Sequence, residues 1–172
     1  MTKTQWYIGA PNGVVLCVNA IRDGEPAGEL YHSYCTEPTP FINFEQMTLT
    51  MERLFDTLHF PHPATNERTF AGETKPAVRA AQTVERKRIM SDENLLSKHG
   101  DIGTFIVRVQ HRQNSSWQGR LTWMEQDKTI SFRSVWEMIK LIESAVDTVS
   151  EQEESAEPVW FVPDGEAENR QN

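Results

Sequence analysis

The amino-acid sequence predicts an α+β fold in which two pseudo-repeats of the unit β-β-(β)-α form one antiparallel sheet with two helices on one face. Three observations lead to this prediction: the chain aligns with itself at one fixed offset, both copies start a helix at the same point, and β-rich segments precede each helix. A two-stranded hairpin is marginal alone, and one helix cannot bury its own apolar side. We therefore expect the two copies to share one sheet.

The two copies are offset by 91 residues, which lays residues 14–59 over residues 105–150 without a gap, and eight of the 46 pairs are identical. The identical pairs are Val18 with Val109, Gly28 with Gly119, Leu30 with Leu121, Phe41 with Phe132, Met47 with Met138, Glu52 with Glu143, Asp56 with Asp147 and Thr57 with Thr148. An internal duplication is therefore expected. It predicts one domain over residues 1–149, with repeat one at 14–59, a connecting segment at 60–103 and repeat two at 104–149.

Segments rich in β-branched and aromatic residues precede each helix. The expected strands are residues 13–21, 29–34 and 40–42 in the first copy, and 104–111, 117–124 and 129–132 in the second. Asn43 and Ser134 then have the character of N-caps, with Gln46 and Glu137 three residues later. The apolar residues after each cap follow the helical period, so we interpret them as core faces. They are Phe44, Met47, Met51, Leu54, Phe55 and Leu58, and Val135, Met138, Ile142, Ala145, Val146 and Val149.

Charge is distributed unevenly along the 172 residues, which carry 25 acidic and 17 basic side chains and a net charge of −8. Residues 150–172 hold seven acids and only Arg170 as a base, a net of −6, which leaves −2 for residues 1–149. A segment with this charge and so few aliphatic residues cannot bury enough apolar area to offset its chain entropy. Residues 150–172 are therefore expected to be an acidic flexible tail. Its apolar island around Trp160 and Phe161 is interpreted either as a loosely docked segment or as a short motif for a protein partner.

The composition also limits the compartment and the chemistry. No apolar run approaches the roughly 20 residues that a membrane helix needs, and the polar start resembles no signal peptide, so a cytoplasmic protein without a membrane partner is expected. Cys17 and Cys35 are too few for a disulfide framework or a four-thiolate zinc site.

No catalytic motif with specific spacing is present, so we expect no enzyme, no catalytic residue, no metal and no cofactor. The five histidines form no His-x-x-x-His pair, and the glycines near the start lack the ending of a phosphate loop. The alternative, a small hydrolase or metal-dependent enzyme, would require His32, Cys35 or His111 to meet carboxylates in a cleft.

The strongest functional signal is the hairpin of the second copy. Residues 105–124 contain no acid, and their basic side chains are interleaved with tryptophans, whereas the matching hairpin of the first copy is acidic. The candidate binding residues there are Arg108, His111, Arg112, Trp117, Arg120 and Trp123. Even spacing along a strand places Arg108 and Arg112 on one face, and we expect that face to be open to solvent. The face of Trp123 is not determined by the sequence.

The connecting segment adds to this basic character. Residues 75–90 carry a net charge of +4, with Arg86, Lys87 and Arg88 in a row. Arginines beside aromatic rings on an open sheet are typical of single-stranded nucleic-acid binders, in which bases stack on the rings. The alternatives are that the tryptophans belong to the core, or that the face binds a protein, for which Trp and Arg are the usual anchors.

Residues 104–119 (TFIVRVQHRQNSSWQG), continued by 121–123 and 131–142, resemble a family of uncharacterised small proteins of Gram-positive gut bacteria and their mobile elements. The likeness extends upstream to residues 54–61 and 65–70 and leaves out the tail. No catalytic motif belongs to this family, so the resemblance implies no site residue. In topology alone, the repeated unit is similar to the PUR and Whirly architecture of single-stranded nucleic-acid binders. Small acidic proteins of mobile elements also include inhibitors of CRISPR nucleases.

Together these features predict a non-enzymatic binding protein that engages nucleic acid or a nucleic-acid-bound protein complex, with an anti-CRISPR role as one form of that activity. The alternatives are a protein-interaction module without nucleic-acid contact, and the small enzyme described above. The acidic tail could compete for the basic hairpin as a phosphate mimic, and free sheet edges would allow a homodimer.

Overall fold

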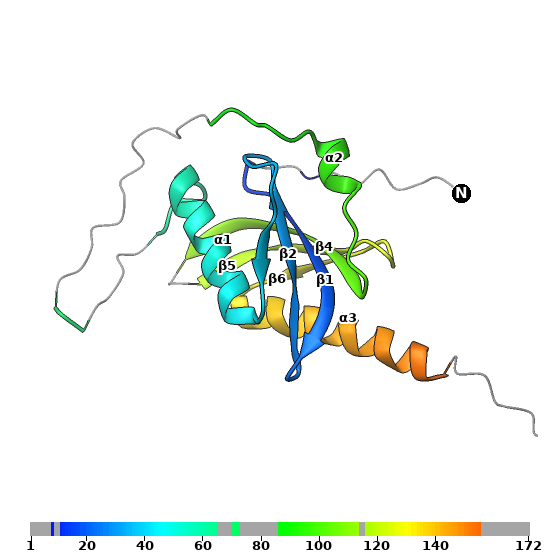
Figure 1. Cartoon of the computed structure of the whole chain (residues 1–172). Helices are drawn as coiled ribbons and strands as arrows, with labels where there is room; N and C mark the ends of the chain where they lie inside the picture. Colours follow the sequence, from blue (N-terminus) through cyan, green and yellow to red (C-terminus); the bar gives the residue numbers. More distant parts are fainter. Residues whose placement is uncertain (1–7, 9–10, 65–69, 73–85, 114–115, 156–172) are drawn as a thin grey trace, which may run out of the picture.

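The computed structural model describes residues 8, 11–64, 70–72, 86–113 and 116–155. The fold is α+β, with one antiparallel sheet of six strands in the order β3-β2-β1-β4-β5-β6 and three helices (Figure 1). The strands are β1 (Val14–Arg22), β2 (Glu25–His32), β3 (Thr39–Phe41), β4 (Gly103–Gln113), β5 (Ser116–Trp123) and β6 (Lys128–Phe132). The helices are α1 (Phe44–Leu58), α2 (Asp92–Leu96) and α3 (Val135–Ser155).

The two halves of the sheet have the same element order and meet where β1 pairs with β4. In that pairing Val15 lies opposite Ile106, which is the residue 91 positions later. Both halves also contain a bulge, between Val18 and Ala20 and between Val109 and His111, again 91 residues apart. These regularities agree with the offset found in the sequence, while a common origin of the two halves stays a prediction.

The close approach of strands at the bulges requires glycine at two positions. Gly28 lies opposite Val18, and Gly119 lies opposite Val109. A Cβ atom on Gly119 would overlap the carbonyl oxygen of Arg108, and one on Gly28 would overlap the carbonyl oxygen of Cys17. Only a residue without a side chain fits here.

The predicted N-caps form as expected. The Asn43 side chain accepts a hydrogen bond from the Gln46 amide at 2.8 Å, and Ser134 accepts one from the Glu137 amide at 3.0 Å. The side chain of Glu137 reaches back to the Arg133 amide at 2.7 Å. Each helix therefore starts directly after the edge strand of its own half, which directs it across the sheet.

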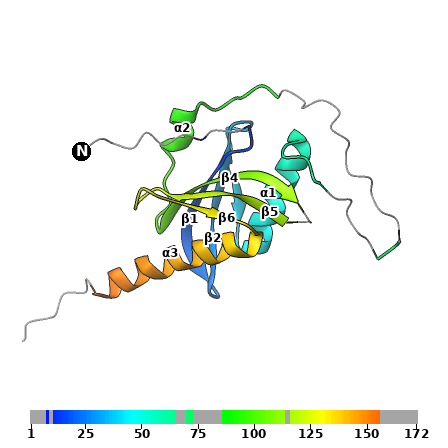
Figure 2. The same cartoon turned by 180° about the vertical axis from the view of Figure 1, so that it is seen from behind.

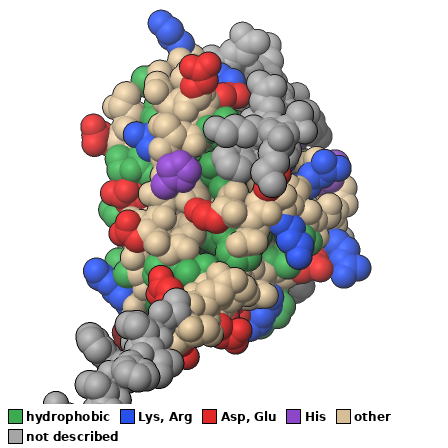
Figure 3. Space-filling model, turned by 90° about the vertical axis from the view of Figure 1, so that its right-hand side faces the viewer, with side chains coloured by type: hydrophobic (Ala, Val, Ile, Leu, Met, Phe, Trp, Pro, Cys, Tyr) green, Lys and Arg blue, Asp and Glu red, His purple; other side chains and the backbone are tan. Residues whose placement is uncertain are grey.

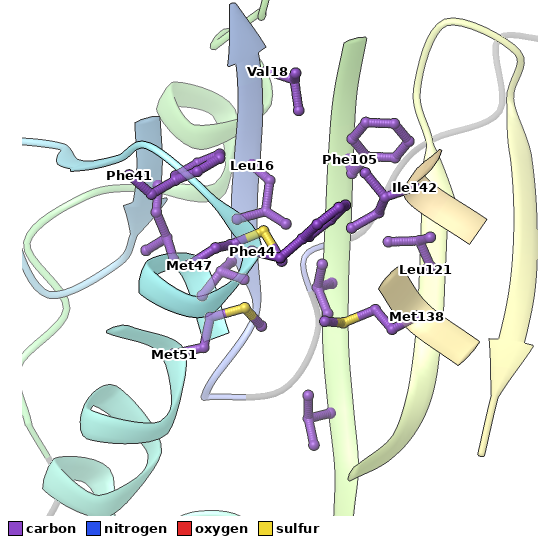
Figure 4. Close-up of a cluster of buried hydrophobic side chains, with 14 of the residues drawn as sticks. Leu16, Val18, Phe41, Phe44, Met47, Met51, Phe105, Leu121, Met138 and Ile142 are labelled. Carbon is purple, nitrogen blue, oxygen red and sulfur yellow. The ribbon is translucent and has the colours of Figure 1, made fainter. Parts of the chain in front are cut away.

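Both long helices cover one face of the sheet, as predicted. Met47 and Met51 of α1 and Met138 and Ile142 of α3 point toward each other over β1 and β4, and all four are fully buried (Figure 4). The sheet contributes Phe105 and its neighbours to the same cluster (Figure 4). This shared core means that neither half buries its apolar face alone.

The opposite face, which we call the outer face, is partly covered, which corrects the expectation of an open face. The connecting segment crosses it, and Met90 and Leu95 bury Val15, Cys17 and Ile106 in a second apolar cluster, together with Ile8 and Met124. Both views place α2 on the side of the sheet away from α3 (Figure 1 and Figure 2). Helix α2 starts directly after Ser91, whose side chain accepts a hydrogen bond from the Asn94 backbone amide at 3.3 Å.

The last helix is longer than predicted. Helix α3 continues to Ser155, into the segment expected to be a tail, and its end projects beyond the sheet (Figure 1). No glycine or proline interrupts the sequence before Pro158, so the helix has no reason to end at Val149. The exposed residues 150–155 add length without core contacts.

Candidate functional site

The bulge in β4 separates the basic residues of the second hairpin. Two residues, Gln110 and His111, lie opposite the single residue Gln118, so the alternation of side chains shifts by one position. Arg108 follows Ile106 on the outer face, whereas Arg112 lies on the helix face. The expectation that both arginines share a solvent-facing surface is therefore wrong.

Arg112 is held in a buried cluster and is only 4% exposed. Its Nη1 donates to Glu52 Oε1 at 2.9 Å and to Asp56 Oδ1 at 2.7 Å, both on α1. Its Nε donates to the carbonyl oxygen of Pro61 at 2.6 Å, and its guanidinium lies 5.9 Å from the Phe55 ring centroid. These contacts fasten the end of β4 to α1 and to the segment that follows it, which makes this arginine a structural residue.

Trp117 belongs to the same cluster and is 5% exposed. Its indole N–H donates to Glu52 Oε2 at 2.8 Å, and its ring meets Phe55 edge to face at 5.2 Å between centroids. Trp117 is therefore a core residue, which is the alternative that the sequence left open.

Trp123 also faces the helices, because it lies opposite Phe105 in the sheet and stacks on that ring at 6.3 Å. It lines a pocket of about 330 Å³ between α3 and the last strands. The pocket is lined by Phe105, Leu121, Trp123, Gln126, Lys128, Ile130, Leu141, Ser144, Ala145 and Thr148. Neither tryptophan of the hairpin can stack bases on the outer face.

The candidate residues of the hairpin that lie on the outer face are the basic ones Arg108, His111 and Arg120. Arg108 lies directly opposite Arg120, and Arg120 lies opposite Ser131 of β6. Arg120 and His111 are exposed, and Arg108 is partly buried. Both side chains of this cross-strand pair are cationic, which is the charge that suits an anionic ligand.

The basic segment before α2 lies at the same level of the sheet. Arg88 Nη2 donates to Ser33 Oγ at 3.0 Å and to Asp92 Oδ1 at 2.6 Å. Val14 pairs with both His32 and Val107, so continuing the register by one residue places Ser33 and Arg108 in one row across the sheet. We call Arg88, Arg108 and Arg120 the arginine row.

Arg86 and Lys87 are exposed beside this row. On the side of the molecule seen in Figure 3, acidic and basic side chains are interspersed over the described surface (Figure 3). No broad basic patch covers the described surface on that side.

The residues of the enzyme alternative are placed as follows. His32 is partly buried on β2, and its Nδ1 accepts from the Tyr34 amide at 3.1 Å, while burial lowers the pKa of this imidazole. Cys35 is exposed in the loop after β2, and His111 is exposed on the outer face of β4. Within the described residues, no three His, Cys, Asp or Glu side chains are grouped so that they could hold a metal ion.

Sequence reasoning missed two features of this region. The first is the pair Glu52 and Asp56, whose spacing of four residues on a helix was a signal for a shared cation. The second is the pocket on the helix face, which depends on how α3 diverges from the sheet and has no local signal.

Comparison with protein-family models, with curated proteins and with solved structures finds no match for this chain. Among the described helices, none combines the length and the apolar character that crossing a membrane requires. Trp160 and Phe161, predicted as a tail motif, lie outside the described residues.

Proposed function

We propose that the protein is a non-enzymatic binding module that engages nucleic acid, or a protein complex that carries it, through the phosphate backbone. The observation that supports this proposal is the cross-strand pair Arg108 and Arg120 on the outer face, continued by Arg88 in the same row. Guanidinium groups bind phosphate in two-pronged geometry, and strand spacing of about 4.8 Å sets them close enough to contact successive groups.

The mode of binding follows from the position of the tryptophans. Trp117 and Trp123 pack against the helix layer, so neither tryptophan of the hairpin offers a ring for base stacking on the outer face. Binding then depends on charge rather than on base identity, and the overall charge of −8 opposes it. We expect weak binding with little sequence preference and a strong dependence on salt.

Fluorescence anisotropy of labelled single- and double-stranded oligonucleotides, measured from low to moderate salt, tests this proposal. Each lost phosphate contact lowers the slope of log affinity against log salt by about 0.7 for single strands and about 0.9 for duplexes. Arg120→Ala is expected to lower the slope by about one contact. The matched control is Arg53→Ala, which removes an exposed arginine from α1.

The proposal fails if the full-length protein binds none of these nucleic acids at low salt, or if Arg120→Ala and Arg53→Ala weaken binding equally. Because Arg120 is exposed and lies on the surface of the sheet, its loss is expected to leave the fold intact. Circular dichroism of both variants checks this point.

The alternative function, a protein-interaction module, is favoured by the pocket on the helix face. Its floor is apolar, with Phe105, Leu121 and Leu141. Such a surface suits an apolar side chain of a partner. Peptides selected from a random library for binding to the wild-type protein should lose binding to a Leu141→Asp variant and keep binding to Arg120→Ala. The reverse pattern would contradict this function.

A further inference from the structure

The two edges of the sheet differ in how they are protected. Strand β3 has three residues and contains Pro40, and the next amide, of Ile42, donates to the Gln46 side chain at 2.9 Å. Strand β6 has five residues without proline, and its first four residues are exposed. Among the described residues, β6 pairs with β5 alone, so its other edge has no neighbouring strand. Such an edge is a template for another strand.

The backbone groups that face this edge can be identified from the register. The Met124 backbone amide donates to the Thr104 carbonyl of β4 at 2.9 Å, so the backbone groups of Met124 face β4. Successive residues of a strand alternate in this direction, so the backbone groups of the preceding residue, Trp123, face β6. Because these directions alternate, Lys128 and Ile130 face β5, and Thr129 and Ser131 direct their N–H and C=O groups away from the sheet. The next outward amide, of Arg133, is already bound by Glu137. The free edge therefore offers two donors and two acceptors.

We propose that this edge is a self-association site, at which β6 pairs antiparallel with β6 of a second copy about a two-fold axis through Ile130. In this register Thr129 of each copy lies opposite Ser131 of the other, so the outward groups of both copies form a complete set of four hydrogen bonds. A closed two-fold contact of this kind is the commonest form of homo-oligomer.

The side chains of β6 are compatible with this register. Ile130, which is 39% exposed, meets its own counterpart on the helix face. Lys128 lies opposite Phe132 of the second copy, so no like charges are opposed within the strands. In the same register the positions of Asp127 and Arg133 are opposed just beyond the strands, and Arg133 keeps its ion pair with Glu137 of its own chain, so no like charges meet there either. This complementarity of β6 with itself is why a second copy is the occupant that we propose.

The contact is small, because each copy contributes five residues. An interface of this size lies well below the standard 1,200–2,000 Å², so a weak dimer that forms only at high protein concentration is expected. The site is separate from the proposed nucleic-acid binding, because it uses the backbone of an edge strand and no residue of the arginine row.

Disulfide trapping tests the register directly. In a Cys35→Ser background, Ile130→Cys places two thiols at a non-hydrogen-bonded pair with Cα atoms about 4.5 Å apart, within the range that a disulfide bridges. The matched control is Lys128→Cys, whose two copies would be offset by four residues, or about 13 Å along the strands. Cys17 does not interfere, because it is buried.

Under mild oxidation, the Ile130→Cys variant should form a covalent dimer, and the Lys128→Cys variant should stay monomeric on a non-reducing gel. Equal trapping of both variants, or trapping of neither, would overturn the proposal.

Sedimentation of the full-length chain gives an independent test without added thiols. The wild type should dimerise as its concentration rises toward about 500 μM. Ser131→Pro removes an outward amide and should abolish dimerisation, because proline is tolerated at an edge whose N–H faces solvent but cannot donate to a new strand. Ser131→Ala keeps the amide and should dimerise like the wild type. A wild type that stays monomeric, or a Ser131→Pro variant that associates normally, contradicts the proposed pairing.

Discussion

Replacement of Arg112 by methionine is the most informative perturbation of this structure. The side chain makes three hydrogen bonds, to Glu52, Asp56 and Pro61, and it connects the second half of the sheet to the helix of the first half. Methionine keeps most of the aliphatic contact with Phe55 and removes the charge. The Arg112→Met variant therefore isolates the polar part of the cluster.

The loss of folding stability in Arg112→Met can be worked out from the three hydrogen bonds of Arg112. At the lower end of their range, hydrogen bonds to charged groups contribute about 1.5 kcal/mol each, so the three together contribute about 4.5 kcal/mol before exposure is considered. Asp56 and Glu52 are 56% and 34% exposed, so water recovers about half of the loss at the two carboxylates. The carbonyl of Pro61 is left without its donor in a buried position. The expected destabilisation is about 3 kcal/mol.

Urea denaturation followed by circular dichroism measures this loss. With a slope of about 2 kcal/mol/M, a loss of about 3 kcal/mol lowers the midpoint by about 1.5 M urea. Arg112→Lys should recover only part of it, because lysine lacks the planar fork that reaches three acceptors. A midpoint within about 0.3 M of the wild type for Arg112→Met would refute the structural role of this cluster. If the variant folds normally but no longer binds oligonucleotides, Arg112 contributes to nucleic-acid binding.

Three further predictions concern backbone packing, protonation and thiol chemistry. Gly119→Ala should lower the free energy of unfolding by about 2 kcal/mol, because the new methyl group overlaps a backbone carbonyl of the adjacent strand. The pKa of His32 is lowered by burial, so the unfolded chain binds a proton at a higher pH than the folded chain does, and stability should fall as the pH decreases below the ordinary value of 6.5. Burial raises the pKa of the Cys17 thiol to about 12, so in the native protein a thiol reagent at pH 8 should modify Cys35 and leave Cys17 unmodified.

Each of these predictions has a matched control. Ser131→Ala adds no atom to the sheet and should change the unfolding free energy by less than about 0.5 kcal/mol. His32→Asn keeps an acceptor for the Tyr34 backbone amide and does not titrate near neutral pH, so it should flatten the pH dependence. In denaturant both cysteines should react. Equal reaction rates of the two thiols in the native protein would contradict the burial of Cys17.

The elements of this fold were predictable because their signals are local. The caps at Asn43 and Ser134, the apolar period after each cap and the β-rich segments all act within one or two turns of chain. The antiparallel sheet with α1 and α3 on one face followed from them. The cover on the outer face was not predictable, because Met90 and Leu95 reach it only through the long connection between the halves.

The candidate site was harder to predict, because the sheet face on which a side chain lies depends on the pairing register between strands. A single extra residue at Gln110 moves Arg112 to the helix face, and no residue type in that strand marks the bulge. Trp117 lies on β5, where no bulge interrupts the alternation, and it shares the helix face with Leu121 and Trp123. Arg120 and Arg108 lie before the bulge, so simple alternation describes them correctly.

The pairing of β1 with β4 has a consequence for how the chain folds. Val15 and Ile106 are 91 residues apart, and closing a loop of that length costs about 4 kcal/mol of chain entropy plus a constant. The hairpins on either side are local and can form early, but their shared apolar face is buried only once this central pair has formed. We therefore expect the central pairing to be the rate-limiting step of folding, and substitutions at Val15 or Ile106 to slow folding more than they speed unfolding.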